Sequence, residues 1–325
     1  MVAASLLFCL LCLLGIDLFL HWHFRNSTGI NIRGYRGPVV GSKLSGEFRV
    51  IVLGGSTVFG FRVKPWESFP AQLEEKLNKR YFPRRFRVVN LGWSNDGAYS
   101  FQWTLRDYDT LDYDLAIFYE GYNDLSPNTF VFRNTSPVFK LTGYFPLLPI
   151  YLREQASFLR GAENLSASRQ GHTVFGSAFA MQTTREALEM ASRVSDSLEN
   201  QLGKLSKHPD WSPQAATPSA CKEPWVAYCR SMETAVRVVL DSHRKAMVVV
   251  QPFFSDKHFE QQQALAGVLL ADFPSQPGLF YVNLGNAIDL KDRRLCADGL
   301  HLSVEGNGVI AEQLVNPVLA SAQGS

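Results

Sequence analysis

The chain has little net charge, few cysteines, and no repeated or low-complexity segment. Its 32 basic and 30 acidic residues leave a formal charge of +2 over 325 residues. This balance gives no reason to expect nucleic acid as a partner. Hydrophobic residues make up 46% of the chain, which is enough for a well-buried core. The composition therefore favours a globular protein, and any function must be inferred from local patterns.

The five cysteines do not decide the cellular compartment. Cys9 and Cys12 lie in an apolar N-terminal run, which leaves Cys221, Cys229 and Cys296. One disulfide and one free thiol would fit an oxidising compartment, whereas three buried thiols would fit the cytoplasm. Outside the apolar run, no cysteines have the C-x-x-C spacing of a zinc site, and no nucleotide-binding motif is present. We therefore expect no metal ion and no other cofactor.

The one long hydrophobic run lies at the N-terminus. Residues 2–22 (VAASLLFCLLCLLGIDLFLHW) are apolar except for Ser5 and Asp17. A helix of this length can cross a bilayer, which takes about 20 residues. The run has no charged segment before it and no small-residue cleavage site after it, so a transmembrane anchor over residues 1–23 is favoured over a cleaved signal peptide. A buried core helix is the third alternative.

Five short apolar runs have the length and composition of buried strands. They are residues 48–53, 86–91, 115–119, 246–251 and 279–284. Apolar residues at helical spacing predict helices over residues 66–79, 187–205 and 225–239. A last helix is expected to begin at Ser303, a good N-cap residue. The alternation predicts an α/β domain over residues 47–320, with a parallel sheet covered by helices on both faces.

Two segments do not follow this alternation. Residues 24–46 form a glycine-rich linker, and residues 126–180 form an insertion. Within the insertion, residues 136–152 (SPVFKLTGYFPLLPIYL) are rich in aromatic residues and proline. The insertion is either a lid or wall of a substrate cleft or a packing element that covers core.

Polar residues follow the predicted strands where ligands of parallel sheets bind, beyond the carboxyl ends. GGST (54–57) follows the first strand, NLGWSNDG (90–97) includes the end of the second, EGYND (120–124) follows the third and DGLH (298–301) follows the fifth. Each motif alone is more often a turn. Their order and placement together indicate a site for nucleophilic catalysis.

The residue types at these positions are those that acyl transfer requires. A hydroxyl nucleophile needs a base within hydrogen-bond reach and a group that orients the base. Ser56 is the candidate nucleophile, His301 the candidate base, and Asp298 the group that orients it. The side chain of Asn123 can donate a hydrogen bond to the developing oxyanion. Of the seven histidines, only His301 has an aspartate three residues before it in a glycine-containing loop.

These four blocks resemble the SGNH (GDSL-type) hydrolase superfamily. VIVLGGSTVFG, GYND and DGLHLSVEGN match in order over residues 48–125 and 246–315, although Gly55 stands where the family usually has Asp. The resemblance implies a three-layer, flavodoxin-like fold with a five-stranded parallel sheet, here preceded by one transmembrane helix. It implies Ser56 as nucleophile, His301 as base, Asp298 as its orienter and Asn123 as an oxyanion donor.

The second block departs from the family pattern. Family members usually carry a glycine five residues after the Asn of this block, and its backbone N–H lines the oxyanion hole. That position is Asn95 here. Asparagine tolerates a positive φ better than most residues, so the N–H of Asn95 can serve. A shifted loop that uses Gly92 or Gly97 is the alternative.

The resemblance implies a serine esterase that hydrolyses an acyl or acetyl ester through an acyl-enzyme. An O-acyltransferase acting on a carbohydrate, with the same triad, and a non-catalytic scaffold are the alternatives. The substrate is a small-molecule, lipid or carbohydrate ester, and one site geometry serves all three. Such activities are commoner outside the cytoplasm, so we expect a periplasmic or extracellular domain. The basic residues after the apolar run, Arg25, Arg33 and Arg36, favour the opposite orientation.

Overall fold

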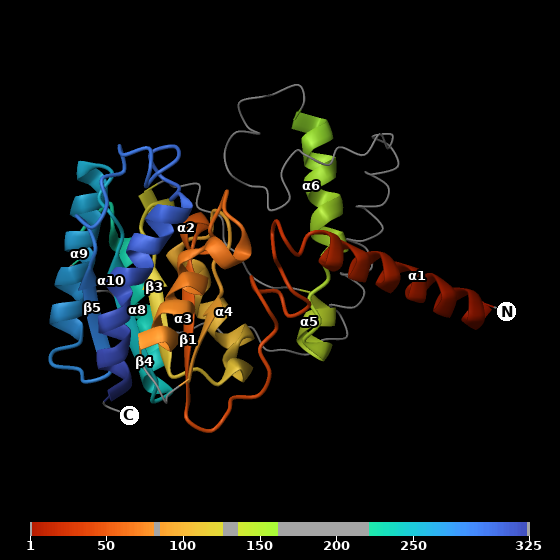
Figure 1. The fold of residues 1–325 in the computed structure, drawn as a ribbon, viewed down its shortest axis with the longest axis horizontal. Helices are drawn as coiled ribbons and strands as arrows, with labels where there is room; N and C mark the ends of the chain where they lie inside the picture. Colours follow the sequence, from red (N-terminus) through yellow and green to blue (C-terminus); the bar gives the residue numbers. More distant parts are fainter. Residues whose placement is uncertain (1, 81–84, 126–135, 162–220, 324–325) are drawn as a thin grey trace. The chain divides into compact units, whose positions relative to one another are not determined.

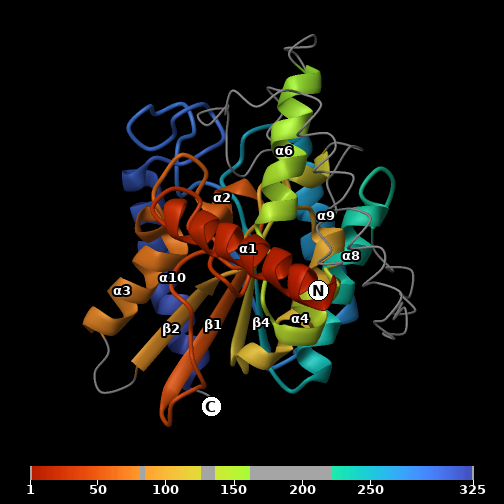
Figure 2. The same cartoon turned by 90° about the vertical axis from the view of Figure 1, so that its right-hand side faces the viewer.

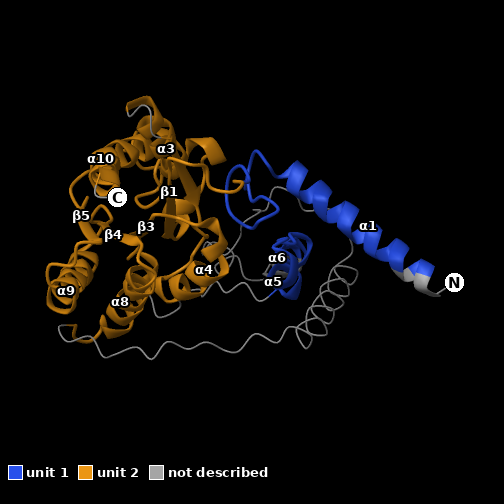
Figure 3. Ribbon diagram, turned by 90° about the horizontal axis from the view of Figure 1, so that it is seen from below, with its two compact units in different colours: residues 1–39, 135–210 blue, residues 40–134, 211–325 orange. Residues whose placement is uncertain are grey.

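The computed structural model describes residues 2–80, 85–125, 136–161 and 221–323. The chain divides into two compact units, which Figure 3 shows in different colours. Unit 1 comprises residues 1–39 and 135–210, and unit 2 comprises residues 40–134 and 211–325. The predicted helix over residues 187–205 and much of the predicted insertion lie outside the described residues.

Unit 2 is built on a five-stranded parallel sheet (Figures 1 and 2). The strands are β1 (Glu47–Gly54), β2 (Arg85–Asn90), β3 (Leu115–Tyr119), β4 (Lys245–Val250) and β5 (Leu279–Asn283). Their order is β2-β1-β3-β4-β5, and every neighbouring pair is parallel. This order is that of flavodoxin-like sheets. The five strands are confirmed, each bound agreeing with the prediction to within one residue.

Helices cover both faces of the sheet, so unit 2 has three layers. Figure 3 shows α3 (Phe69–Arg80) and α10 (Val304–Gln323) on one face, and α4 (Phe101–Asp107), α8 (Val226–Asp241) and α9 (Asp256–Asp272) on the other. Alternate β1 residues, Phe48, Val50 and Val52, pack with Leu73 and Leu77 of α3 in one buried cluster. Because both faces of each central strand are covered, the strands have the continuous apolar sequences that predicted them.

The ends of several helices follow from local sequence. The helix predicted over residues 66–79 is divided into the short helix η1 (Pro65–Glu67) and α3, because Ser68 between them has an extended backbone with ψ 151°. At α10, the hydroxyl of Ser303 accepts a hydrogen bond from the N–H of Gly306 at 3.1 Å, as expected of an N-cap. Short helices also occur in loops: α2 (Ser56–Phe59), η2 (Ala98–Ser100), η3 (Asp109–Leu111) and η4 (Asn123–Leu125).

Unit 1 contains α1 (Val2–His23), α5 (Pro137–Thr142) and α6 (Leu148–Gly161). Among the residues described here, no helix combines the length and the apolar character needed to cross a bilayer. The predicted transmembrane anchor over residues 1–23 is therefore not confirmed. The sequence gives no sign that this helix forms a compact unit with the segment after residue 135.

The polar end of α1 is bonded to other parts of unit 1. Asp17 is buried and accepts hydrogen bonds from the N–H of Leu148, at 2.6 Å, and from the hydroxyl of Tyr144. Its helical neighbour His21 contacts two backbone carbonyls, Nδ1 with Ile30 at 3.1 Å and Nε2 with Phe145 at 3.0 Å. Asp17, whose charge would be costly inside a bilayer, thus has hydrogen-bond partners within the protein.

The contacts of His21 favour the protonated form of its ring. A carbonyl oxygen only accepts hydrogen bonds, so both ring nitrogens must carry a hydrogen to bond Ile30 and Phe145. Burial lowers the pKa of His21, but the bond with Asp17 and the two carbonyls outweigh it, and the net shift is upward. The imidazolium lies 3.4 Å from the Asp17 carboxylate, which balances its charge.

The cysteines of unit 2 form one pair and one free thiol. Cys221 and Cys229 are joined by a disulfide, and Cys296 is buried and unpaired with another cysteine. Of the two arrangements that the sequence allows for these cysteines, the structure has one disulfide and one free thiol.

Candidate active site

Ser56 lies at the sharp turn between β1 and α2, at the carboxyl end of the sheet. The turn of α2 is closed by Gly60, which has a left-handed backbone with φ 79°. Val58 and Phe59 are buried and hold the short helix against the sheet, whereas Ser56 is partly exposed. A glycine-serine turn after a buried strand therefore presents a hydroxyl at the edge where ligands of parallel sheets bind.

The structure brings the three predicted catalytic residues into one hydrogen-bonded row. The hydroxyl of Ser56 lies 3.0 Å from Nε2 of His301, although 245 residues separate them in the chain. Nδ1 of His301 lies 2.8 Å from Oδ2 of Asp298. Since a carboxylate accepts, Nδ1 carries the hydrogen, and Nε2 is left to accept the Ser56 proton. This is the geometry of a nucleophile, its base and the group that orients the base.

Asp298 is held in its ionised form by its own loop. Its Oδ1 accepts the backbone N–H of His301 at 2.8 Å and that of Leu300 at 3.1 Å. Burial raises the pKa of Asp298, but the hydrogen bonds from His301 and Leu300 and the electrostatic attraction of the His301 ring outweigh burial, and the pKa of Asp298 lies below its usual value. Asp-x-x-His spacing thus lets one carboxylate fix both the loop and the imidazole.

Two further residues contact this row and were not predicted. The ring of Phe61 packs on the imidazole of His301 with centroids 4.8 Å apart. The guanidinium of Arg62 lies 3.5 Å from Oδ2 of Asp298, and Arg62 has a left-handed backbone with φ 71°. Both follow Ser56 by only a few residues, but no sequence pattern shows that the chain turns back over the histidine.

Asn123 lies beside the nucleophile, in the loop that follows β3. A Cβ atom placed on Gly55, the neighbour of Ser56, would lie 2.0 Å from Nδ2 of Asn123. That nitrogen donates to the backbone oxygen of Asp96 at 2.7 Å. This bond fixes the orientation of the amide group beside Ser56.

The loop after β2 has the conformation expected if Asn95 replaces the family's glycine. Asn95 has a left-handed backbone with φ 61°. The N–H of Gly92 instead donates to the side chain of Asn90 at 3.0 Å, and a Cβ on Gly92 would lie 2.5 Å from the backbone of Phe59. Gly92 is therefore required for close packing on α2, and its N–H is engaged. Asn95 as the backbone donor, with Gly92 or Gly97 as the alternative, stays a prediction.

A buried acid also lies in this region and was not predicted as a site residue. Glu120 directly follows β3 and is 1% exposed. Its carboxylate accepts the backbone N–H of Gly55 at 2.6 Å. The available signal was an acidic residue in the last position before a glycine, where an otherwise apolar strand enters the predicted site.

The described parts of the chain contain no group of three or more His, Cys, Asp or Glu side chains that could hold a metal ion.

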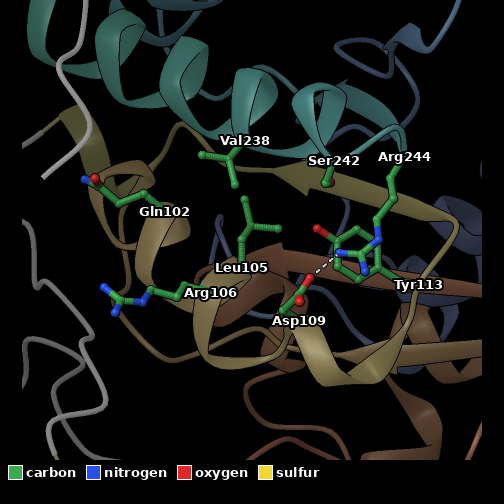
Figure 4. A pocket seen from close by; sticks show the side chains of 8 residues that line it. All are labelled: Gln102, Leu105, Arg106, Asp109, Tyr113, Val238, Ser242 and Arg244. Carbon is green, nitrogen blue, oxygen red and sulfur yellow. Dashed lines mark hydrogen bonds and ion pairs between the residues drawn. The ribbon is translucent and has the colours of Figure 1, made fainter. Parts of the chain in front are cut away.

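A pocket of about 380 Å³ lies elsewhere on unit 2 (Figure 4). It is at the amino ends of β3 and β4, opposite to the edge that carries Ser56. Leu105 and Val238 form its apolar part, while the guanidinium of Arg244 pairs with Asp109 and packs on the ring of Tyr113 at 4.3 Å. None of the predicted site residues lines this pocket.

Comparison with solved structures finds distant similarities. A lipase/acylhydrolase from Enterococcus faecalis has 13% identity and a TM-score of 0.43, over 83% of this chain and 95% of the other. A family 3 carbohydrate esterase from Clostridium thermocellum has 11% identity and a TM-score of 0.43, over 84% and 98%. A member of the lipolytic protein G-D-S-L family from Veillonella parvula DSM 2008 has 7% identity and a TM-score of 0.42, over 83% and 97%. No protein-family model and no curated protein matches the chain.

Proposed function

We propose that this protein is a serine esterase of the SGNH type that hydrolyses an acyl or acetyl ester. The observation that carries the proposal is the row formed by Ser56, His301 and Asp298, with contacts of 3.0 and 2.8 Å. Its position at the carboxyl end of a parallel sheet, beside the Asn123 amide, supports the same conclusion. The three motifs that contain Ser56, Asn123, and Asp298 with His301 resemble the SGNH pattern in order, which supports the proposal.

The first half of the reaction transfers the acyl group to the enzyme. Nε2 of His301 takes the proton of Ser56 as its oxygen attacks the ester carbonyl, and a tetrahedral oxyanion forms. The Asn123 amide and the backbone N–H groups of Ser56 and Asn95 donate to that oxyanion. The imidazolium then gives its proton to the departing alcohol, and the acyl group stays on Ser56. Asp298 remains ionised throughout and stabilises the imidazolium.

The second half releases the acid. Water attacks the acyl-enzyme carbonyl while His301 takes one of its protons, and a second oxyanion forms at the same donors. Its collapse returns the proton from His301 to Ser56 and frees the carboxylic acid. A carbohydrate hydroxyl in the place of water would give O-acyl transfer instead, so polysaccharide acceptors belong in the assay.

The test is hydrolysis of p-nitrophenyl acetate, butyrate and octanoate by the full chain and by Ser56→Ala. We expect Ser56→Ala to lose hydrolysis while its thermal unfolding stays unchanged. Ser231→Ala is the matched control, because its hydroxyl bonds only within α8, to the carbonyl of Ala227. Unchanged hydrolysis by Ser56→Ala would refute the proposal.

We also propose that unit 2 functions outside the cytoplasm. The Cys221–Cys229 disulfide supports this location, because such bonds persist in oxidising compartments. Protease accessibility tests it, on intact cells and, where an outer membrane is present, after that membrane has been removed; protection of unit 2 until the cytoplasmic membrane is permeabilised would contradict it.

A further inference from the structure

One buried carboxylate connects the nucleophile turn to the loop that carries Asn123. Oε2 of Glu120 accepts the N–H of Gly55 at 2.6 Å, and Oε1 accepts those of Gly121 at 2.9 Å and Asn123 at 3.1 Å. Gly55 directly precedes Ser56, and Asn123 is the proposed oxyanion donor. The two groups that must hold a fixed distance from one another in the reaction are therefore tied to the same side chain.

The backbone of Glu120 is held from the opposite side. Its carbonyl accepts the hydroxyl of Tyr228 at 2.9 Å and the amide of Gln262 at 3.4 Å. Tyr228 belongs to α8 and Gln262 to α9, and both side chains are buried. The carboxylate is thus fixed by the helical layer behind it, which makes it a rigid support for the two loops in front.

The same arrangement explains why residue 55 is a glycine. A Cβ on Gly55 would lie 2.0 Å from Nδ2 of Asn123 and 3.0 Å from Oε2 of Glu120. The SGNH pattern usually has Asp at this position, and here that space is filled by Asn123 and Glu120. This chain therefore supplies a carboxylate at the nucleophile turn from the loop after β3, where the pattern has it on the residue before the serine.

The groups around the Glu120 side chain are hydrogen-bond donors, so its oxygens act as acceptors. All three contacts at its oxygens come from backbone N–H groups, which only donate. The pKa of Glu120 lies well above its usual value, because burial and the nearby Asp124 carboxylate raise it more than the Gly121 and Asn123 amides lower it. Removing one oxygen leaves a buried N–H without its acceptor, which is costly in a site closed to water.

We propose that Glu120 is a positioning residue that sets the geometry between Ser56 and the Asn123 amide. The inference rests on the proposed esterase function. Glu120 does not touch the ester; it acts through the two groups that do. Stabilisation of the transition state depends on this spacing more strongly than binding of the substrate does. We therefore expect loss of the Glu120 contacts to lower kcat and to leave KM nearly unchanged.

The test compares Glu120→Gln with wild type in the hydrolysis of p-nitrophenyl acetate. Glutamine keeps the shape but turns one acceptor oxygen into a donor that opposes a backbone N–H. We expect kcat to fall about 10- to 100-fold with KM changed by less than about threefold. Glu233→Gln is the matched control, because Glu233 is also buried in unit 2 but pairs with Arg237 on α8. Wild-type kcat in Glu120→Gln would overturn the inference.

A double-mutant cycle separates positioning from a general loss of folding. If Glu120 acts through Asn123, the loss caused by Glu120→Gln shrinks in an Asn123→Ala background. Losses that simply multiply would overturn the positioning role. Should Glu120→Gln not fold, Gly55→Ala tests the same geometry, because its methyl group displaces the Asn123 amide. It is predicted to lower kcat as Glu120→Gln does, and Gly41→Ala, where no atom lies within 4 Å, is its control.

The same experiment keeps the two proposals apart. Hydrolysis that wild type shows and Ser56→Ala lacks supports the esterase function, whatever Glu120→Gln does. An unaffected Glu120→Gln against that background overturns the Glu120 inference alone. Hydrolysis that persists in Ser56→Ala refutes the esterase mechanism and, with it, the role of Glu120.

Discussion

The substitution Asn123→Ala tests the oxyanion site, because it removes one donor and leaves the rest of the row in place. The amide nitrogen of Asn123 has two hydrogens, and one is bonded to the Asp96 carbonyl at 2.7 Å. In the proposed mechanism the same amide group also donates to the oxyanion. The backbone N–H of Asn123 still donates to Glu120 in the variant, so the course of the loop is preserved.

The expected loss has two separable parts. Removing one oxyanion donor costs about 10²- to 10³-fold in kcat, or about 2.7–4 kcal/mol of barrier. Removing the bond to Asp96 costs about 1 kcal/mol of folding stability, which lowers Tm by about 2–4 °C for a domain of this size. KM should change little, because the donor acts on charge that develops in the transition state.

The assay is steady-state hydrolysis of p-nitrophenyl acetate, with thermal unfolding of each variant in the same buffer. Asn78→Ala is the matched control. Its amide bonds the carbonyls of Glu74 and Phe86, both at 2.9 Å, so its loss destabilises unit 2 without touching the site. We expect Asn78→Ala to lower Tm and keep kcat. A kcat for Asn123→Ala within about tenfold of wild type would refute its role as an oxyanion donor.

Three further predictions follow from the charges of the described residues. Asp298→Asn should lower kcat by about 10⁴-fold, because the amide can no longer hold His301 in the tautomer that accepts from Ser56; stopped-time ester assays measure this, and a loss below about tenfold would contradict it. Asp124 is half-buried, and desolvation raises its pKa to about 6. Its ionisation therefore opposes folding as pH rises from about 4 to 7, and Asp124→Asn should gain about 2 kcal/mol over wild type across that range, measured by urea unfolding; a gain independent of pH would contradict it. The pKa of His21 is raised despite its burial, since Asp17 and two carbonyls favour the protonated ring. The stabilisation that protonated His21 gives to the folded state is complete below about pH 6.5 and is lost as the pH rises through the higher pKa of the folded state. Wild type should therefore have a free energy of unfolding about 1–2 kcal/mol above that of His21→Gln at pH 5.5, and this difference should shrink by pH 9. A difference that grows with pH would contradict the prediction.

The sheet could be predicted from the sequence because its strands are buried on both faces. Burial on two sides demands continuous apolar residues, and the runs at 48–53 and 115–119 show this plainly. The site residues could also be predicted, since each follows a strand and parallel strands end at one edge. The contact between Ser56 and His301 is a consequence of that topology.

Other elements gave weak sequence signals for physical reasons. α9 buries polar residues, among them His258, Gln261 and Gln262, so it has no clear apolar stripe. α4 is only one or two turns long, too short for a helical period to stand out. Neither was predicted.

The role of Glu120 could not be predicted because its partners are backbone amides. Every residue except proline has a peptide N–H, so the type of the residue that donates such a hydrogen bond does not reveal the bond. The small residue at Gly55 was visible, but the reason for it is the Asn123 amide that fills the space. Only the three-dimensional arrangement connects the two observations.

For the N-terminal helix, the hydropathy of the sequence did not indicate the contacts that the structure shows. The run over residues 2–22 has the length and composition that predicted a transmembrane anchor. Asp17 was the discordant residue, and the structure gives it hydrogen-bond partners at Tyr144 and Leu148. These partners are far away in the sequence, so the sequence alone did not indicate them.

The central claim is that Ser56 is a nucleophile activated by His301, and labelling with a fluorophosphonate probe tests it most directly. Full-length wild type, Ser56→Ala, His301→Ala and Ser231→Ala would be labelled in parallel, with intact mass spectrometry to locate the adduct. The account predicts one adduct on Ser56 in wild type and Ser231→Ala, none in Ser56→Ala, and a rate at least about 10³-fold lower in His301→Ala. Absence of labelling in folded wild type, or labelling that persists in Ser56→Ala, would contradict it.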